Sequence, residues 1–143
     1  MSSGLESLLK KLRRASTKEQ ALREAYRAIT TRFHGKRFVT LWDALKYSGK
    51  DQQQLWASPG HLDCVNQNKL LEFLLVQSGK FSNSDIQRQW TLYWGISPHQ
   101  YLKVNVGSHM VNVDAWSSFY GIKLGDYGRF FHTKTSEEEY EDI

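Results

Sequence analysis

The stretch that decides the fold of this chain covers residues 60–79 and reads GHLDCVNQNKLLEFLLVQSG. Six apolar side chains between Leu70 and Val76 cover most of the circumference of a helix. The spacing therefore predicts a central helix, from Cys64 to Gln77, that is buried on nearly all sides. Gly79 supplies the left-handed residue that ends such a helix.

Cys64, the only cysteine of the 143-residue chain, enters this helix in its first turn. A thiol at a helix N-terminus faces unpaired backbone N–H groups and the positive end of the helix dipole, which both favour the thiolate. The neighbouring carboxylate of Asp63 opposes thiolate formation by charge repulsion and offsets part of this effect. Cys64 is therefore a candidate nucleophile, and a single cysteine excludes an internal disulfide.

The part of the chain before this helix is helical and basic. Residues 1–50 hold 12 Lys and Arg against 4 Asp and Glu, whereas residues 51–143 hold 7 against 11. Leucines at helical spacing and a capping box at Ser16 and Thr17 mark the first two helices. The spacing predicts helical segments at residues 4–15, 16–32, 38–47 and 51–57.

Beyond Gly79 the pattern changes from helical to alternating, and the residues become aromatic and β-branched. It predicts a short turn at residues 82–85, strands at residues 88–94, 98–106 and 110–114, and one more strand with loops after Trp116. The fold class is therefore α+β, in which N-terminal helices and a central Cys-bearing helix pack on a small antiparallel β-sheet.

The length of the chain favours one domain, since the sequence has no internal repeat and no linker rich in Pro, Gly or Ser. We expect it to cover residues 1–132, with basic helices in 1–50 and the chemical core in 51–132. The acidic tail at residues 133–143 is expected to be disordered.

Two polar residues of the predicted strands lie where a nucleophilic cysteine needs them. His99 lies near the start of one strand, and Asp114 ends the strand that is hairpinned to it through the turn at residues 106–110. Pairing across that turn brings residue 114 near residues 101 or 102, beside the histidine. A thiol, an imidazole that takes its proton and a carboxylate that orients the imidazole form a catalytic triad.

These residues resemble the transglutaminase-like superfamily, a group of thiol enzymes that includes transglutaminases, peptide N-glycanases and microbial proteases. The resemblance covers residues 55–116 and follows the family's order of Cys64, His99 and Asp114. It implies a papain-like/transglutaminase-like core in which Cys64 is the nucleophile, His99 the general base and acid, and Asp114 the orienting acid. It also implies a side-chain donor for the oxyanion, for which Gln54, Trp56 and Trp42 are the candidates.

By the same resemblance the protein is a cysteine peptidase or amidase, or a protein-glutamine acyltransferase, that needs no cofactor. Its substrate is then a protein or peptide, and the acyl group goes to water or to an amine. His61 and Trp56 either shape a substrate pocket around Cys64 or only pack against it.

Other functions have weaker support in the sequence. A non-catalytic module of the same fold would dock an acidic partner or nucleic acid through the basic helices at residues 5–32. Zinc ligation by His61, Cys64 and either His99 or His109 lacks a second close pair of ligands, so no metal site is predicted. The tryptophans and tyrosines favour core packing over stacking on nucleic acid.

The chain shows no apolar run long enough to span a membrane and no signal peptide at its N-terminus. A lone cysteine suits a reducing compartment, so we expect a cytoplasmic protein.

Overall fold

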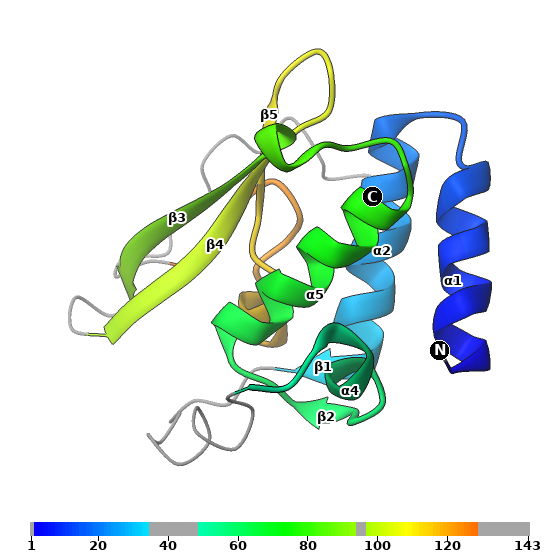
Figure 1. Cartoon of the computed structure of the whole chain (residues 1–143). Coiled ribbons are helices and arrows are strands. Elements are labelled where there is room, and N and C mark those ends of the chain that lie inside the picture. Colours follow the sequence, from blue (N-terminus) through cyan, green and yellow to red (C-terminus); the bar gives the residue numbers. More distant parts are fainter. Residues whose placement is uncertain (1, 35–48, 94–96, 129–143) are drawn as a thin grey trace.

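The computed structural model of the chain describes residues 2–34, 49–93 and 97–128, and Figure 1 shows its arrangement. No helix within those ranges is both long and apolar enough to cross a bilayer. The predicted helix at residues 38–47, the end of the predicted strand at Trp94 and the acidic tail lie outside the described residues. The helices are α1 (Ser3–Arg14), α2 (Lys18–Arg32), α4 (Gln52–Trp56), α5 (Cys64–Gln77) and the 3-10 turns η1 (Asn83–Asp85) and η2 (Trp116–Tyr120). The strands are β1 (Phe33–His34), β2 (Gly60–His61), β3 (Ile86–Tyr93), β4 (Ser97–Asn105) and β5 (Met110–Val113).

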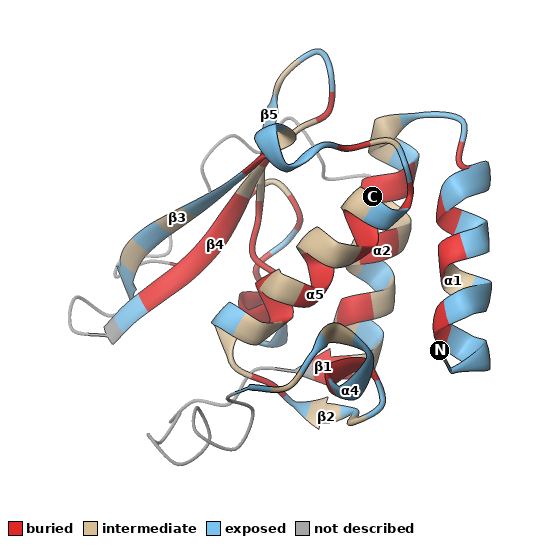
Figure 2. Ribbon diagram, viewed as in Figure 1, coloured by how far each residue is buried: buried red, intermediate tan, exposed pale blue. Residues whose placement is uncertain are grey.

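The helix α5 has the predicted bounds and lies at the centre of the structure. It begins at Cys64 because the side chain of Asp63 accepts a hydrogen bond from the backbone N–H of Asn66 at 2.9 Å, as an N-cap does. It ends before Gly79, whose φ of 75° is left-handed. Only Val65 and Gln77 of its side chains are exposed, which confirms a central and largely buried helix (Figure 2).

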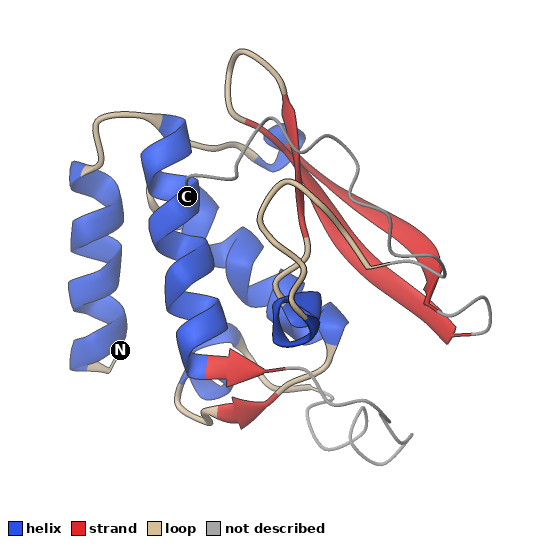
Figure 3. Cartoon of the chain, turned by 180° about the vertical axis from the view of Figure 1, so that it is seen from behind, coloured by secondary structure: helices blue, strands red, loops and turns tan. Residues whose placement is uncertain are grey.

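The first two helices form a pair that packs on α5 (Figures 1 and 3). The leucine stripe of α1 is fully buried, at Leu5, Leu9 and Leu12, while its basic face is exposed (Figure 2). The second helix starts after Thr17, whose hydroxyl accepts from the N–H of Gln20 at 3.1 Å. The amphipathic first helix and the Thr17 cap are thus as predicted.

The two short strands β1 and β2 were not predicted. Strands β1 and β2 pair in parallel, with Phe33 opposite Gly60, and each is only two residues long. The helix α4, which matches the helical turn predicted at residues 51–57, precedes β2 and begins with a capping box between Asp51 and Gln54. Strands this short carry no alternating pattern, so the sequence gives no sign of them.

The larger sheet has the order β3-β4-β5 and is antiparallel throughout, which confirms the α+β class. Leu102 and Val104 of β4 face α5 and are fully buried. His99 and Tyr101 point to the opposite face, because side chains alternate along a strand. Residues 115–128 cover that opposite face (Figure 3).

The prediction of one more strand after Trp116 is wrong for the described residues. The segment forms the 3-10 turn η2 instead, and Gly121, with a φ of 85°, closes it. The N–H of Ser117 bonds to the side chain of Asp114 and that of Ser118 to the carbonyl of Ala115. These local bonds satisfy the backbone groups that a strand would have paired with a neighbour.

Candidate active site

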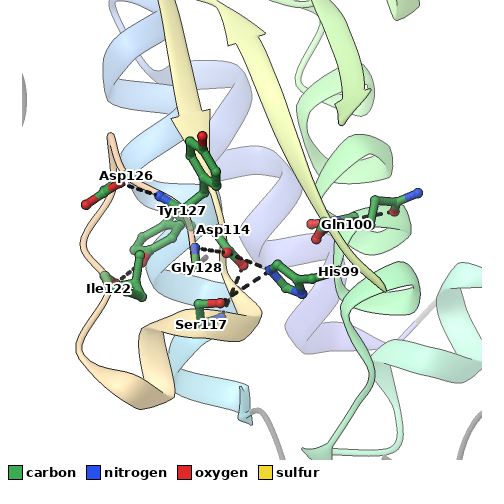
Figure 4. A network of polar contacts seen from close by, with 10 residues as sticks. His99, Gln100, Asp114, Ser117, Ile122, Asp126, Tyr127 and Gly128 are labelled. Carbon is green, nitrogen blue, oxygen red and sulfur yellow. Dashed lines mark hydrogen bonds and ion pairs between the residues drawn. The ribbon is translucent and has the colours of Figure 1, made fainter. Parts of the chain in front are cut away.

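The site is built around a buried histidine and a buried aspartate. The Nε2 atom of His99 lies 2.7 Å from Oδ2 of Asp114, and the two side chains are 3% and 1% exposed. Leu102 is paired with Val113, so residue 114 reaches the strand beside Tyr101, two residues from His99 on the same face. The predicted contact between the two residues is thus confirmed (Figure 4).

The thiol of Cys64 meets this pair from the start of α5. Burial lowers the pKa of His99, but its hydrogen bonds with the Asp114 carboxylate and with Cys64, together with the negative charge of Asp114, outweigh burial and raise that pKa to about 9. Asp114 is bonded to Nε2 of His99, so Nδ1 is the other ring nitrogen that can exchange a proton. Cys64 is half-buried, so the sulfur is close to the imidazole and still reachable from solvent.

Two backbone N–H groups hold Asp114 in place besides the histidine. Gly128 donates to Oδ2 at 2.7 Å, and Ser117 donates to Oδ1 at 3.2 Å (Figure 4). The hydroxyl of Ser117 also lies 3.3 Å from Nε2 of His99. Three donors around one buried carboxylate stabilise its charge and fix its direction.

A stacked pair of tyrosines brings the backbone N–H of Gly128 to the site. The rings of Tyr101 on β4 and Tyr127 lie 4.1 Å apart and nearly parallel. The N–H of Gly125 bonds to the carbonyl of Asn112 at 2.8 Å, which ties the same loop to β5. These two contacts hold the loop against the sheet, so that Gly128 reaches Asp114.

Two further aromatic residues cover the imidazole and the carboxylate. The ring of Trp116 lies 5.2 Å from that of His99 and is 7% exposed. Tyr26 reaches the same region from α2: burial and the negative charge of Asp114 raise its pKa above the ordinary range. The ion pair therefore lies in a largely apolar shell, where its attraction is screened less than in water.

A buried amide pair joins the helix of the thiol to the strand of the imidazole. The Nδ2 atom of Asn68 donates to the backbone carbonyl of Gln100 at 3.0 Å and to its Oε1 at 3.2 Å. Asn68 lies one turn after Cys64, and Gln100 follows His99 directly. The two bonds therefore fix the distance between the elements that carry sulfur and ring.

The other sequence candidates are engaged elsewhere. Gln54 is exposed, and its Oε1 accepts from the N–H of Asp51 at 3.0 Å. Trp56 is buried, with the guanidinium of Arg32 4.7 Å from its ring and Phe33 edge-on to it. These contacts give both residues a structural role, so neither is supported as an oxyanion donor.

Of the last two candidates, the structure describes only His61. His61 is exposed on β2, and Trp42 lies outside the described residues. No set of three or more His, Cys, Asp or Glu side chains in residues 2–34, 49–93 and 97–128 is arranged to hold a metal ion. The alternative of a zinc site at His61, Cys64 and a second histidine therefore finds no support.

Sequence reasoning missed the residues that support the triad. Asp114 and Ser117 are three apart, the spacing at which an aspartate caps a turn, so the bond between them was detectable. Asn68 and Gln100 are polar residues inside an apolar helix and strand, which is itself a sign of a buried polar contact. The position of Gly128 had no such sign, because it depends on the path of the whole loop.

Comparisons of the chain with family models, with curated proteins and with solved structures found no match.

Proposed function

We propose that the protein is a thiol enzyme that cleaves or transfers the acyl group of an amide bond, with Cys64 as nucleophile, His99 as general base and acid, and Asp114 as orienting acid. The observation that carries this proposal is the line of contacts from the half-buried thiol through the imidazole to a buried carboxylate. This arrangement suits transglutaminase-like chemistry. The order of the three residues along the chain also resembles that of the transglutaminase-like superfamily.

The first half of the reaction forms a thioester. His99 takes the thiol proton, and the sulfur of Cys64 attacks the carbonyl carbon, so that the carbonyl electron pair moves onto oxygen. As the tetrahedral intermediate collapses, the protonated His99 gives its proton to the leaving amine and the carbon–nitrogen bond breaks. Because its pKa is raised to about 9, His99 keeps the proton taken from the thiol at neutral pH until it gives that proton to the leaving amine.

The second half releases the acyl group. Water or an amine attacks the thioester and gives its proton to His99, the carbon–sulfur bond breaks, and Cys64 leaves as a thiolate beside the protonated imidazole. Hydrolysis makes the protein a peptidase or amidase, and attack by an amine makes it an acyltransferase.

A backbone group is the best donor for the oxyanion. Cys64 is the first residue of α5, so its N–H has no acceptor within the helix. Such an N–H, aimed out of a helix N-terminus, stabilises the negative oxygen of a tetrahedral intermediate.

The test is turnover of a panel of peptide p-nitroanilides at neutral pH, followed by release of p-nitroaniline and by mass spectrometry of the intact protein. We expect release by the wild type, an acyl adduct on Cys64, and neither in Cys64→Ala. Added methylamine separates the two outcomes of the second step, because it yields an amide only when the acyl group is transferred. Equal release by Cys64→Ala across the panel would contradict the proposal.

One observation favours a second, non-catalytic function. A hollow between α1 and the start of α2 is lined by three basic side chains, Lys10, Lys11 and Arg14, together with Ser7, Ala15 and Gln20. This surface suits an acidic partner or nucleic acid. Lys11 already binds Glu24 at 2.7 Å, which lowers the net charge there. Salt-dependent retention on heparin that Lys10→Ala/Arg14→Ala removes, with no loss in an exposed-lysine control such as Lys123→Ala, would support it.

A further inference from the structure

Gln67 is a polar side chain at the start of α5, three residues after Cys64, and it is fully buried. Its Nε2 atom donates to the backbone carbonyl of Leu62 at 2.8 Å. Its Oε1 atom is shut off from solvent and meets no donor among the described residues. A buried acceptor without a donor destabilises a fold, so an apolar side chain of similar size would suit the core better. Core packing therefore does not explain why this residue is a glutamine.

Gln67 holds the chain directly before Cys64 with two hydrogen bonds. Its backbone N–H donates to the carbonyl of Asp63 at 3.0 Å, and its side chain donates to the carbonyl of Leu62. The Asp63 carbonyl shares a peptide group with the N–H of Cys64, and the Leu62 carbonyl shares the preceding one with the N–H of Asp63. One residue thus bonds to both peptide groups that lead into the thiol residue.

The bond to Asp63 sets the direction of the Cys64 N–H. The peptide group is planar, and its C=O and N–H point in opposite directions when it is trans. Because the carbonyl of Asp63 points along the helix toward the N–H of Gln67, the N–H of Cys64 points out of the helix N-terminus. This is the direction that the proposed oxyanion donor needs.

The bond to Leu62 extends the hold of the helix by one residue. A longer helix would bond the Leu62 carbonyl to the N–H of Asn66, but that N–H bonds to the side chain of Asp63 at 2.9 Å. The side chain of Gln67 supplies the missing donor. The peptide group between Leu62 and Asp63 is therefore fixed, and it resists rotation of the next group, which carries the N–H of Cys64.

We propose that Gln67 is a positioning residue of the thiol site, which aims the backbone N–H of Cys64 at the oxygen of the tetrahedral intermediate by holding the Leu62 carbonyl. The inference rests on the proposed thiol chemistry and adds the residue that orients its oxyanion donor. Gln67 acts without touching the substrate, because it is fully buried. A donor that is fixed in advance needs no reorganisation as the negative charge forms, so loosening it slows only steps that form an oxyanion.

The test compares two reagents that react with the same sulfur, of which only one forms an oxyanion. With p-nitrophenyl acetate, the sulfur of Cys64 attacks the carbonyl carbon, the electron pair moves onto oxygen, and collapse expels p-nitrophenolate and leaves an acetyl thioester. Iodoacetamide alkylates the same sulfur by direct displacement of iodide. Both rates are measured at pH 7 by intact-protein mass spectrometry, with Cys64→Ala as the blank, and the readout is the ratio of acylation to alkylation.

Gln67→Met keeps the length of the side chain but cannot donate to the Leu62 carbonyl. We expect acylation to slow about tenfold while alkylation stays unchanged, so that the ratio falls about tenfold. The midpoint of urea unfolding should stay close to that of the wild type, because the variant loses one bond and also an acceptor without a donor. Gln67→Leu, with the same expected ratio, is the second variant if circular dichroism shows that Gln67→Met does not fold.

Gln77→Met is the matched control, because it makes the same substitution at an exposed position of the same helix. It should keep both rates.

The outcomes separate this inference from the proposed function. If His99→Ala is acylated as fast as the wild type, the thiol chemistry fails and the inference fails with it. If acylation depends on His99 but the Gln67 variants keep the wild-type ratio, only the role of Gln67 is refuted. An equal loss of both rates would make Gln67 a support of the thiol itself and would also overturn the inference.

Discussion

Replacing Asp114 by asparagine should change the charge of His99 while keeping the shape of the site. Asparagine has the size of aspartate and can still accept a hydrogen bond, but it carries no negative charge. With the carboxylate removed, burial is the main influence on the imidazole, and burial lowers its pKa. We therefore expect the pKa of His99 to fall from about 9 to near or below its ordinary value of 6.5.

The magnitude follows from the wild-type value. The difference between about 9 and 6.5, at about 1.4 kcal/mol per pH unit, is a preference of about 3 kcal/mol for the charged ring in the folded protein. A histidine whose pKa is raised by folding stabilises the protein fully below pH 6.5, and this stabilisation is lost as the pH rises through 9. The free energy of unfolding should therefore fall by about 3 kcal/mol over that window, and Asp114→Asn should lose most of this dependence.

The assay is an NMR titration of the histidine ring protons from pH 5 to 10, in which the resonance of His99 is identified by its absence in His99→Gln. Urea unfolding at pH 6 and at pH 9 gives the stability of both proteins. A wild-type midpoint at or below 6.5, or the same midpoint in Asp114→Asn, would refute the charged pair of His99 and Asp114.

Three further substitutions test the supports of the site. Asn68→Leu leaves the buried acceptors of Gln100 without their donor, so it should cost about 1–3 kcal/mol in urea unfolding and slow alkylation of Cys64, whereas the exposed Gln77→Leu on the same helix should do neither. Gly121→Ala should cost about 1–2 kcal/mol in the same assay, because its φ of 85° is left-handed and strains any residue with a side chain. The new methyl group would meet no atom within 4 Å, so the backbone strain is the whole cost, and an unchanged stability would contradict this. Glu72→Gln breaks a largely exposed ion pair with Arg88 of β3 and should change stability by less than about 1 kcal/mol, so a larger loss would mean that this contact also holds α5 on the sheet.

The sequence predicted the elements of the site better than the contacts within it. The central helix was evident because its apolar residues fill a whole circumference, and its ends were evident from Asp63 and Gly79. The pairing of His99 with Asp114 was predictable because the hairpin register follows from a short turn.

What escaped prediction depends on the tertiary path of the chain. Residues after Trp116 are aromatic and rich in glycine, a composition that fits strands and loops equally well, so their 3-10 turn was taken for a strand. Gly128 reaches Asp114 only because Tyr127 stacks on Tyr101, a contact that no local pattern contains. Gln54 and Trp56 were chosen for their chemistry, whereas a capping box and core packing explain their positions.

The rate of Cys64 alkylation by iodoacetamide at pH 7 tests most directly whether His99 activates the thiol. His99→Ala removes the ring that takes the thiol proton in the proposed mechanism, and His109→Ala, in the β4–β5 turn, removes a histidine away from the site. We expect alkylation of the wild type and of His109→Ala at equal rates, and a rate at least tenfold lower in His99→Ala. Equal rates in all three proteins would contradict an activated thiol and, with it, the proposed enzyme.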